Sequence, residues 1–164
     1  MESSEDLPVS PTRTAMTIGA VTAALMLVVS VLGWQLAGWL MFLGGIYWGM
    51  RRFKNERGGT ITWISAWIAG LQTAFFASII LAFFAYMTTK LEPSLITAIL
   101  DMMEQQLKTS GFPEGLTEMA MQQWRELFSP IVFAVIIIFL YSAIGCFASM
   151  IYALFVNAAK PVNL

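Results

Sequence analysis

The stretch Thr14–Met50, TAMTIGAVTAALMLVVSVLGWQLAGWLMFLGGIYWGM, has 37 residues and carries no formal charge. A single helix of this length would be about 55 Å long, far more than the roughly 30 Å hydrocarbon core of a bilayer requires. Gly33 and Gly38 flank an interfacial tryptophan and a polar glutamine near its middle, where a turn is easily made. We therefore expect this stretch to fold back on itself as two membrane spans.

Two more stretches without formal charge follow, residues 58–89 with 32 residues and residues 127–159 with 33. The chain of 164 residues is 58% hydrophobic and 12% charged, against roughly 45–50% and 25% in soluble domains. A chain this short leaves much of its surface exposed, so we expect lipid rather than water to cover the excess. The predicted spans cover about residues 14–33, 35–53, 60–89 and 130–159.

The distribution of cations orients these spans. Four spans place both termini and the connection RRFKNERGG, residues 51–59, on one side of the membrane with six of the nine lysines and arginines. Because loops rich in lysine and arginine stay in the cytoplasm, both termini are predicted to be cytoplasmic. Residues 1–13 are expected to be a disordered cytoplasmic tail, and residues 14–164 a single four-span membrane domain.

The segment between spans three and four differs from the rest of the chain, because apolar residues recur there at helical spacing. We predict an extracytoplasmic amphipathic helical hairpin over about residues 93–128. Its apolar faces could pack on each other, on the membrane surface or on a protein partner, although its acidic excess disfavours anionic headgroups. The predicted partner face comprises Leu95, Ile99, Met103, Met119 and Trp124.

Polar residues within and beside the spans are the remaining candidates for a site. The basic residues Arg51, Arg52, Lys54 and Arg57 are predicted to orient the spans, or to contact anionic lipid or a partner. Side chains that would join neighbouring helices by hydrogen bonds, or line a polar path, are Gln72, Ser142 and Asn157. Small residues four positions apart, such as Gly145 and Ser149, predict close helix packing.

Several classes of chemistry have little support in the residues. The chain has no histidine and one cysteine, and no ionisable acid or base falls inside a predicted span, apart from Arg51 and Arg52 at the end of the second, which are expected to reach the headgroups. A nucleophile paired with a base is not recognisable, so no catalytic residue, no metal site and no cofactor is expected. No basic stripe suited to nucleic acid is present either.

Two segments carry a family resemblance. The run GGTITWISAWIAG, residues 58–70, follows the basic loop, and IYALFVNAAKP, residues 151–161, lies near the end of the sequence. Together with the helical segment ending in Ser129 and Pro130, they resemble the bacterial membrane proteins catalogued as domain of unknown function 4199. The resemblance covers nearly the whole chain and implies a four-span bundle in a bacterial inner membrane, with no established activity to transfer.

These observations give two functional expectations. The first is an all-α polytopic membrane bundle that serves as a non-enzymatic scaffold or accessory subunit. Its expected partners are the lipid bilayer and either a membrane or periplasmic protein or a second copy of the chain. The alternative is a transporter or channel for a small neutral or lipophilic solute.

Overall fold

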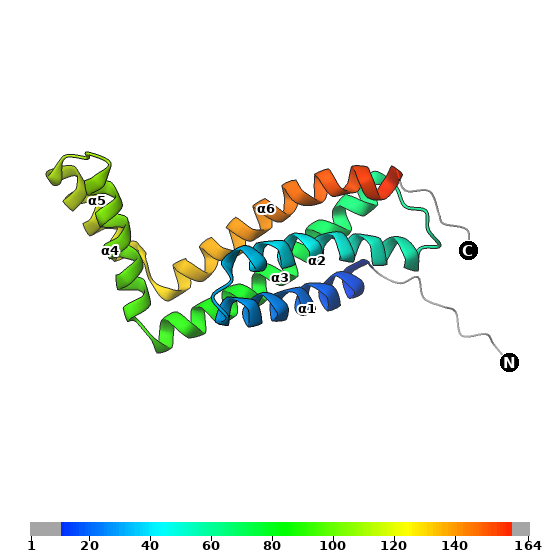
Figure 1. The fold of residues 1–164 in the computed structure, drawn as a ribbon, viewed down its shortest axis with the longest axis horizontal. Coiled ribbons are helices and arrows are strands. Elements are labelled where there is room, and N and C mark those ends of the chain that lie inside the picture. Colours follow the sequence, from blue (N-terminus) through cyan, green and yellow to red (C-terminus); the bar gives the residue numbers. More distant parts are fainter. Residues whose placement is uncertain (1–10, 159–164) are drawn as a thin grey trace. The chain divides into compact units, whose positions relative to one another are not determined.

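The computed structural model describes residues 11–158, and within them it contains six α-helices and no strand (Figure 1). The helices are α1 (Pro11–Val31), α2 (Gln35–Glu56), α3 (Trp63–Leu91), α4 (Ser94–Thr109), α5 (Glu114–Leu127) and α6 (Pro130–Ala158). The predicted all-α class is therefore confirmed. Most of the predicted N-terminal tail lies outside the described residues, and α1 already includes residues 11–13.

Three of the described helices are long and apolar enough to cross a membrane, namely Thr12–Ser30 within α1, Trp63–Leu91 and Pro130–Val156 within α6. Helix α2 does not reach the same hydropathy, because its last turns contain Arg51, Arg52 and Lys54. Large apolar side chains project from α6 with exposed fractions of 60–72%, as at Phe139, Phe147, Leu154 and Phe155. Such a surface is covered by lipid in a membrane protein.

The described chain forms two compact units. Unit one comprises residues 11–81 and 138–158, and therefore contains α1, α2 and parts of α3 and α6. Unit two comprises Ala82–Ile137, with α4, α5 and the adjoining turns of α3 and α6. The two units are considered separately below.

Helices α1 and α2 pack side by side in unit one (Figure 1). The chain reverses between them at Gly33, whose φ of 75° lies in the left-handed region that glycine adopts most readily. The predicted reversal of the first apolar stretch is therefore confirmed. The second predicted span starts at residue 35, where α2 begins, so Gly38 lies in its first turn.

Small residues allow the helices of unit one to approach closely. A Cβ atom added to Gly45 of α2 would lie 2.2 Å from the Thr22 hydroxyl of α1, and one added to Gly145 of α6 would lie 2.2 Å from Ala74 Cβ of α3. Phe42 of α2 is fully buried in the core that these helices share. The close packing predicted from the small residues is thus present at these crossings.

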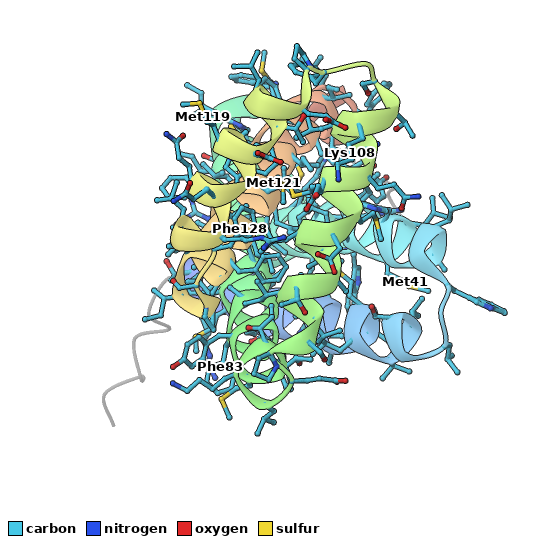
Figure 2. The ribbon with its side chains drawn as sticks, turned by 90° about the vertical axis from the view of Figure 1, so that its left-hand side faces the viewer. Met41, Phe83, Lys108, Met119, Met121 and Phe128 are labelled. Atoms are coloured by element: carbon cyan, nitrogen blue, oxygen red, sulfur yellow. The ribbon has the colours of Figure 1, made fainter. Side chains whose placement is uncertain are left out.

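Helices α4 and α5 of unit two pack against each other around a small core of Ile96, Leu100 and Met121. Leu107, Trp124 and Phe128 are partly buried against it. Figure 2 shows Met121 and Phe128 between the two helices. A short connection with Gly111 at φ 79° reverses the chain, so α4 and α5 run antiparallel.

Candidate functional site

The α4–α5 pair carries an exposed row of apolar side chains. Three of these residues precede a residue of the contact between the helices by one position: Leu95 precedes Ile96 and Ile99 precedes Leu100 on α4, and Leu127 precedes Phe128 at the end of α5. We call this row the apolar stripe: Leu95, Ile99, Met102, Leu116, Met119 and Leu127. Five of the six are exposed and Ile99 is half-buried.

Helix geometry places Leu95 and Ile99 of α4 on the same side of the pair as Leu127 of α5. One residue corresponds to about 100° around a helix, and these residues are displaced from the contact in the same rotational direction. Because antiparallel helices turn in opposite senses when viewed from one end, equal displacements bring them to the same side. Met119 precedes the contact residue Met121 by two positions, so it is displaced further around α5, and Figure 2 shows it on the side of α5 that faces away from α4.

Polar residues follow the contact residues by one position and occupy the opposite side of the pair. They are Asp101 and Lys108 on α4 and Arg125 on α5, which follow Leu100, Leu107 and Trp124. Glu104, one helical turn before Lys108, and Glu118, two turns before Arg125, lie on the same side. Glu104 accepts hydrogen bonds from Lys108 at 2.8 Å and from Arg125 at 3.3 Å. The second bond links the two helices directly, which agrees with polar residues meeting on one side.

The ionic contacts change two pKa values in the expected directions. The hydrogen bond and positive charge of Lys108, supported by Arg125, lower the pKa of Glu104. The same hydrogen bond and the negative charge of Glu104 raise the pKa of Lys108. Each shift favours the charged form, so the polar side is held as an ion pair in neutral water.

The predicted partner face is divided by the structure. Leu95 and Met119 are exposed in the apolar stripe, and Ile99 is half-buried beside them. Trp124 instead packs against the core between α4 and α5, and Met103 is half-buried. The predicted partner face did not include Met102 and Leu116, which are 68% and 58% exposed. Met102 lies three positions after Ile99 and seven after Leu95, a helical spacing that places it on their side of α4.

The predicted basic contact residues adopt different roles in unit one. Lys54 is buried, and its Nζ donates a hydrogen bond of 2.6 Å to the Val156 carbonyl near the end of α6. Arg52 pairs with Glu56 at 3.1 Å, and the Arg57 guanidinium lies 5.0 Å from the centre of the Phe53 ring. Arg51 is exposed. Lys54 therefore joins two helices, whereas Arg51 has its side chain available at the surface.

The predicted polar path does not form a shared cluster among the described side chains. Ser142 lies 3.1 Å from Ser78, so these two hydroxyl groups join α6 to α3. Gln72 is half-buried, and its Oε1 atom is buried without a hydrogen-bond partner among the described residues. The side chain of Asn157 lies outside the described part of the structure. The hydrogen bond of Ser142 corresponds to the predicted joining of helices.

Sequence reasoning missed an aromatic cluster in unit one. Trp39 of α2 stacks on Tyr141 of α6 with ring centres 5.1 Å apart and planes 11° from parallel. Phe42 contacts both rings edge-on, at 6.4 Å and 5.1 Å. The sequence predicts interfacial aromatics in this region, but it does not predict which of them meet across two helices.

Metal ligation has no candidate in the part of the chain that the structure describes. No group of three or more histidine, cysteine, aspartate or glutamate side chains is gathered there in a way that could hold a metal ion. Cys146 is a free thiol on α6.

The all-α fold, with three helices able to cross a bilayer, defines the class: a helical membrane protein. The family described as "Protein of unknown function (DUF4199)" matches residues 13–158, so the chain belongs to this family. The resemblance noted from the two quoted segments is thereby confirmed. Comparisons with curated proteins and with solved structures found no match.

Proposed function

We propose that this chain is a non-enzymatic membrane scaffold or accessory subunit that binds a protein partner through the apolar stripe of α4 and α5. The observation that carries the proposal is the separation of the pair into an apolar side and an ion-paired side. Contiguous exposed apolar residues of this kind are uncommon on surfaces that face only water. Methionine and leucine side chains can repack against partners of different shape.

A four-span topology fits this role. Helix α2 shares its buried Phe42, Ile46 and Met50 with the cores of its neighbours, and its outer surface includes exposed Leu40 and Trp48. These features support its crossing the bilayer beside α1, despite the cations in its last turns. The positive-inside rule then places residues 51–59 in the cytoplasm and the α4–α5 pair on the outer side of a bacterial inner membrane.

A protein suits the apolar stripe better than an anionic lipid surface. Four carboxylates among the described side chains of the pair, Asp101, Glu104, Glu114 and Glu118, exceed its two cations, Lys108 and Arg125. Anionic headgroups would be repelled by this excess, whereas a partner with an apolar patch and a basic rim would be attracted. The proposed partner is therefore a membrane or periplasmic protein of that chemistry.

Site-specific photocross-linking in living cells tests the proposal. A benzophenone amino acid at Leu116 or Met119 should give one discrete adduct, whose cross-linked peptide is identified by mass spectrometry as an apolar patch with neighbouring basic residues. The same probe at Gln122, which is exposed on the polar side of α5, is the matched control and should give no such adduct. Adducts of equal yield at all three positions, or none at the stripe, would overturn the proposal.

Spin labels then separate protein from lipid. A nitroxide on Met119→Cys, in a Cys146→Ala background and in liposomes of the purified protein, should collide readily with a water-soluble nickel complex. The partner, once added, should lower collisions with both the nickel complex and oxygen. High oxygen accessibility in liposomes without a partner would instead show that the stripe lies in lipid, and would refute the proposed docking.

Transport of a neutral solute is the second candidate, favoured by one observation. Thr22 Oγ1, Gln72 Oε1 and Ser149 Oγ are buried without hydrogen-bond partners among the described residues, and such atoms usually bond to water or another group. Close packing opposes a path there, because a Cβ on Gly70 would lie 2.6 Å from Ser149 Oγ. Solute-dependent swelling of proteoliposomes, abolished by Gln72→Leu, would favour transport over the scaffold.

A further inference from the structure

A cavity of about 340 Å³ lies in unit one where the end of α1 and the start of α2 meet α3 and α6. Its apolar lining comes from Met26 and Leu27 of α1 and Leu81 of α3. The volume falls within the range of sites that hold small molecules or parts of larger ones. Four helices therefore contribute to one hollow beside the α1–α2 turn.

One wall of the cavity is held rigidly by aromatic rings. Trp39 and Tyr141 both line it, and their rings stack 5.1 Å apart. The fully buried Phe42 supports both of them from the core by edge-on contacts. A wall fixed in this way needs little reordering when a ligand binds.

Four of the residues that line the cavity carry hydrogen-bond donors, and none of the lining residues carries a formal charge. Ser30 and Tyr141 have hydroxyl groups, and Trp34 and Trp39 have indole N–H groups that can only donate. None of these four side chains has a hydrogen-bond partner among the described residues. The lining therefore suits an uncharged ligand group with acceptor oxygens, such as a carbonyl.

The position of the cavity along α3 corresponds to one of the two membrane interfaces. Leu81 lies 18 helical positions beyond Trp63, which begins α3, and this corresponds to about 27 Å along the helix. That distance is close to the thickness of the hydrocarbon core. With Trp63 at one membrane interface, the cavity lies near the other, where tryptophan and tyrosine are enriched and lipid ester carbonyls occur.

We propose that this cavity binds one phospholipid by its acyl-ester region. The first methylenes of an acyl chain lie against Met26, Leu27 and Leu81, and the ester carbonyl accepts a hydrogen bond from the Tyr141 hydroxyl. This lipid site is independent of the partner surface on α4 and α5. A lipid-soluble quinone also presents carbonyl oxygens, and the test below distinguishes it from the phospholipid.

Two glycines of α2 provide a matched pair of variants. Gly38 lines the cavity, and a Cβ added there would meet no atom within 4 Å, so Gly38→Leu should fill the hollow without disturbing the protein around it. Gly44 also has no atom within 4 Å of an added Cβ, but it does not line the cavity. Gly44→Leu therefore adds the same side chain to the same helix as a control.

Native mass spectrometry of the full chain in detergent micelles tests the site, with phosphatidylethanolamine and decylubiquinone titrated separately. Wild type and Gly44→Leu should retain one phosphatidylethanolamine, and Gly38→Leu should bind it at least tenfold more weakly at an unchanged unfolding temperature. Tyr141→Phe should weaken binding by about two- to tenfold, as expected for the loss of one neutral hydrogen bond. Equal retention by Gly38→Leu and Gly44→Leu, or tighter binding of the quinone, would overturn the proposal.

Discussion

Gly145→Ala probes the contact between α6 and α3 most directly. The Cβ atom added by this change would lie 2.2 Å from Ala74 Cβ, whereas carbon atoms in contact are about 3.5–4.0 Å apart. The alanine methyl group has no rotamer by which it could move aside. The two helices must therefore separate by more than about 1 Å at this crossing.

The expected cost follows from two opposing effects. Overpacking a well-packed core usually costs about 1–3 kcal/mol, while replacing a helical glycine by alanine gains roughly 0.8–1.0 kcal/mol. The overpacking should dominate, because the neighbouring atom cannot rotate away, and we expect a net destabilisation of up to about 2 kcal/mol. The same change at Gly44, where no atom lies within 4 Å of the added Cβ, should be neutral or stabilising.

Unfolding in mixed micelles of increasing dodecyl sulfate content, followed by circular dichroism, measures both variants. A second substitution, Ala74→Gly, should restore stability to Gly145→Ala, because it removes the atom that the new methyl group meets. Together with the Ala74→Gly single variant, the double variant completes a cycle that isolates this contact from the intrinsic cost of the new glycine. If Gly145→Ala proved as stable as Gly44→Ala, the inferred approach of α6 to α3 would be wrong.

Three further predictions concern other contacts. Lys54→Met breaks a charged hydrogen bond between α2 and α6 and should cost about 1.5–3 kcal/mol in the same unfolding assay. Lys108 lowers the pKa of Glu104, so their contact stabilises the α4–α5 pair fully at a pH above the ordinary glutamate pKa. This stabilisation should be lost as the pH falls through the lowered pKa of Glu104. The fluorescence of Trp124, which packs between the two helices, should report the loss. Gly33→Ala should destabilise the chain by about 1 kcal/mol, because φ is 75° there.

Each of these predictions has a matched control. Arg51→Met removes an exposed cation from the same helix and should change stability by less than about 0.5 kcal/mol. Glu104→Gln should abolish the acid transition of the fluorescence, and an unchanged transition would assign it to another group. Gly38→Ala adds a methyl group in open space within a helix, so a loss equal to that of Gly33→Ala would contradict the role of backbone conformation.

Local features made the elements predictable. The turn at Gly33 was expected because an apolar run of 37 residues is too long for one span and contains a permissive residue near its middle. The described helices α3 and α6 begin and end within a few residues of the predicted bounds. The second span was expected to start at Gln35, and α2 begins at that residue.

The candidate sites were less predictable, because they depend on how helices are rotated against each other. Met119 and Trp124 both belong to the apolar side of α5, yet only the packing against α4 exposes the first and partly buries the second. Lys54 was expected to act as a surface cation, but it lies close to the end of a helix distant in sequence and is buried there. Neither outcome can be calculated from spacing within one helix.

The sequence by itself determined which segments form helices and which of them are surrounded by lipid. Both properties depend on the charge content and the apolar spacing of a single segment, and not on its neighbours in the fold. The tertiary structure alone decided which small residues meet, which side of α4 and α5 remains open, and where Trp39, Tyr141 and the end of α1 leave a cavity. These features arise from contacts between residues far apart in the chain. Their geometry depends on the distance and rotation between helices, which no single segment encodes.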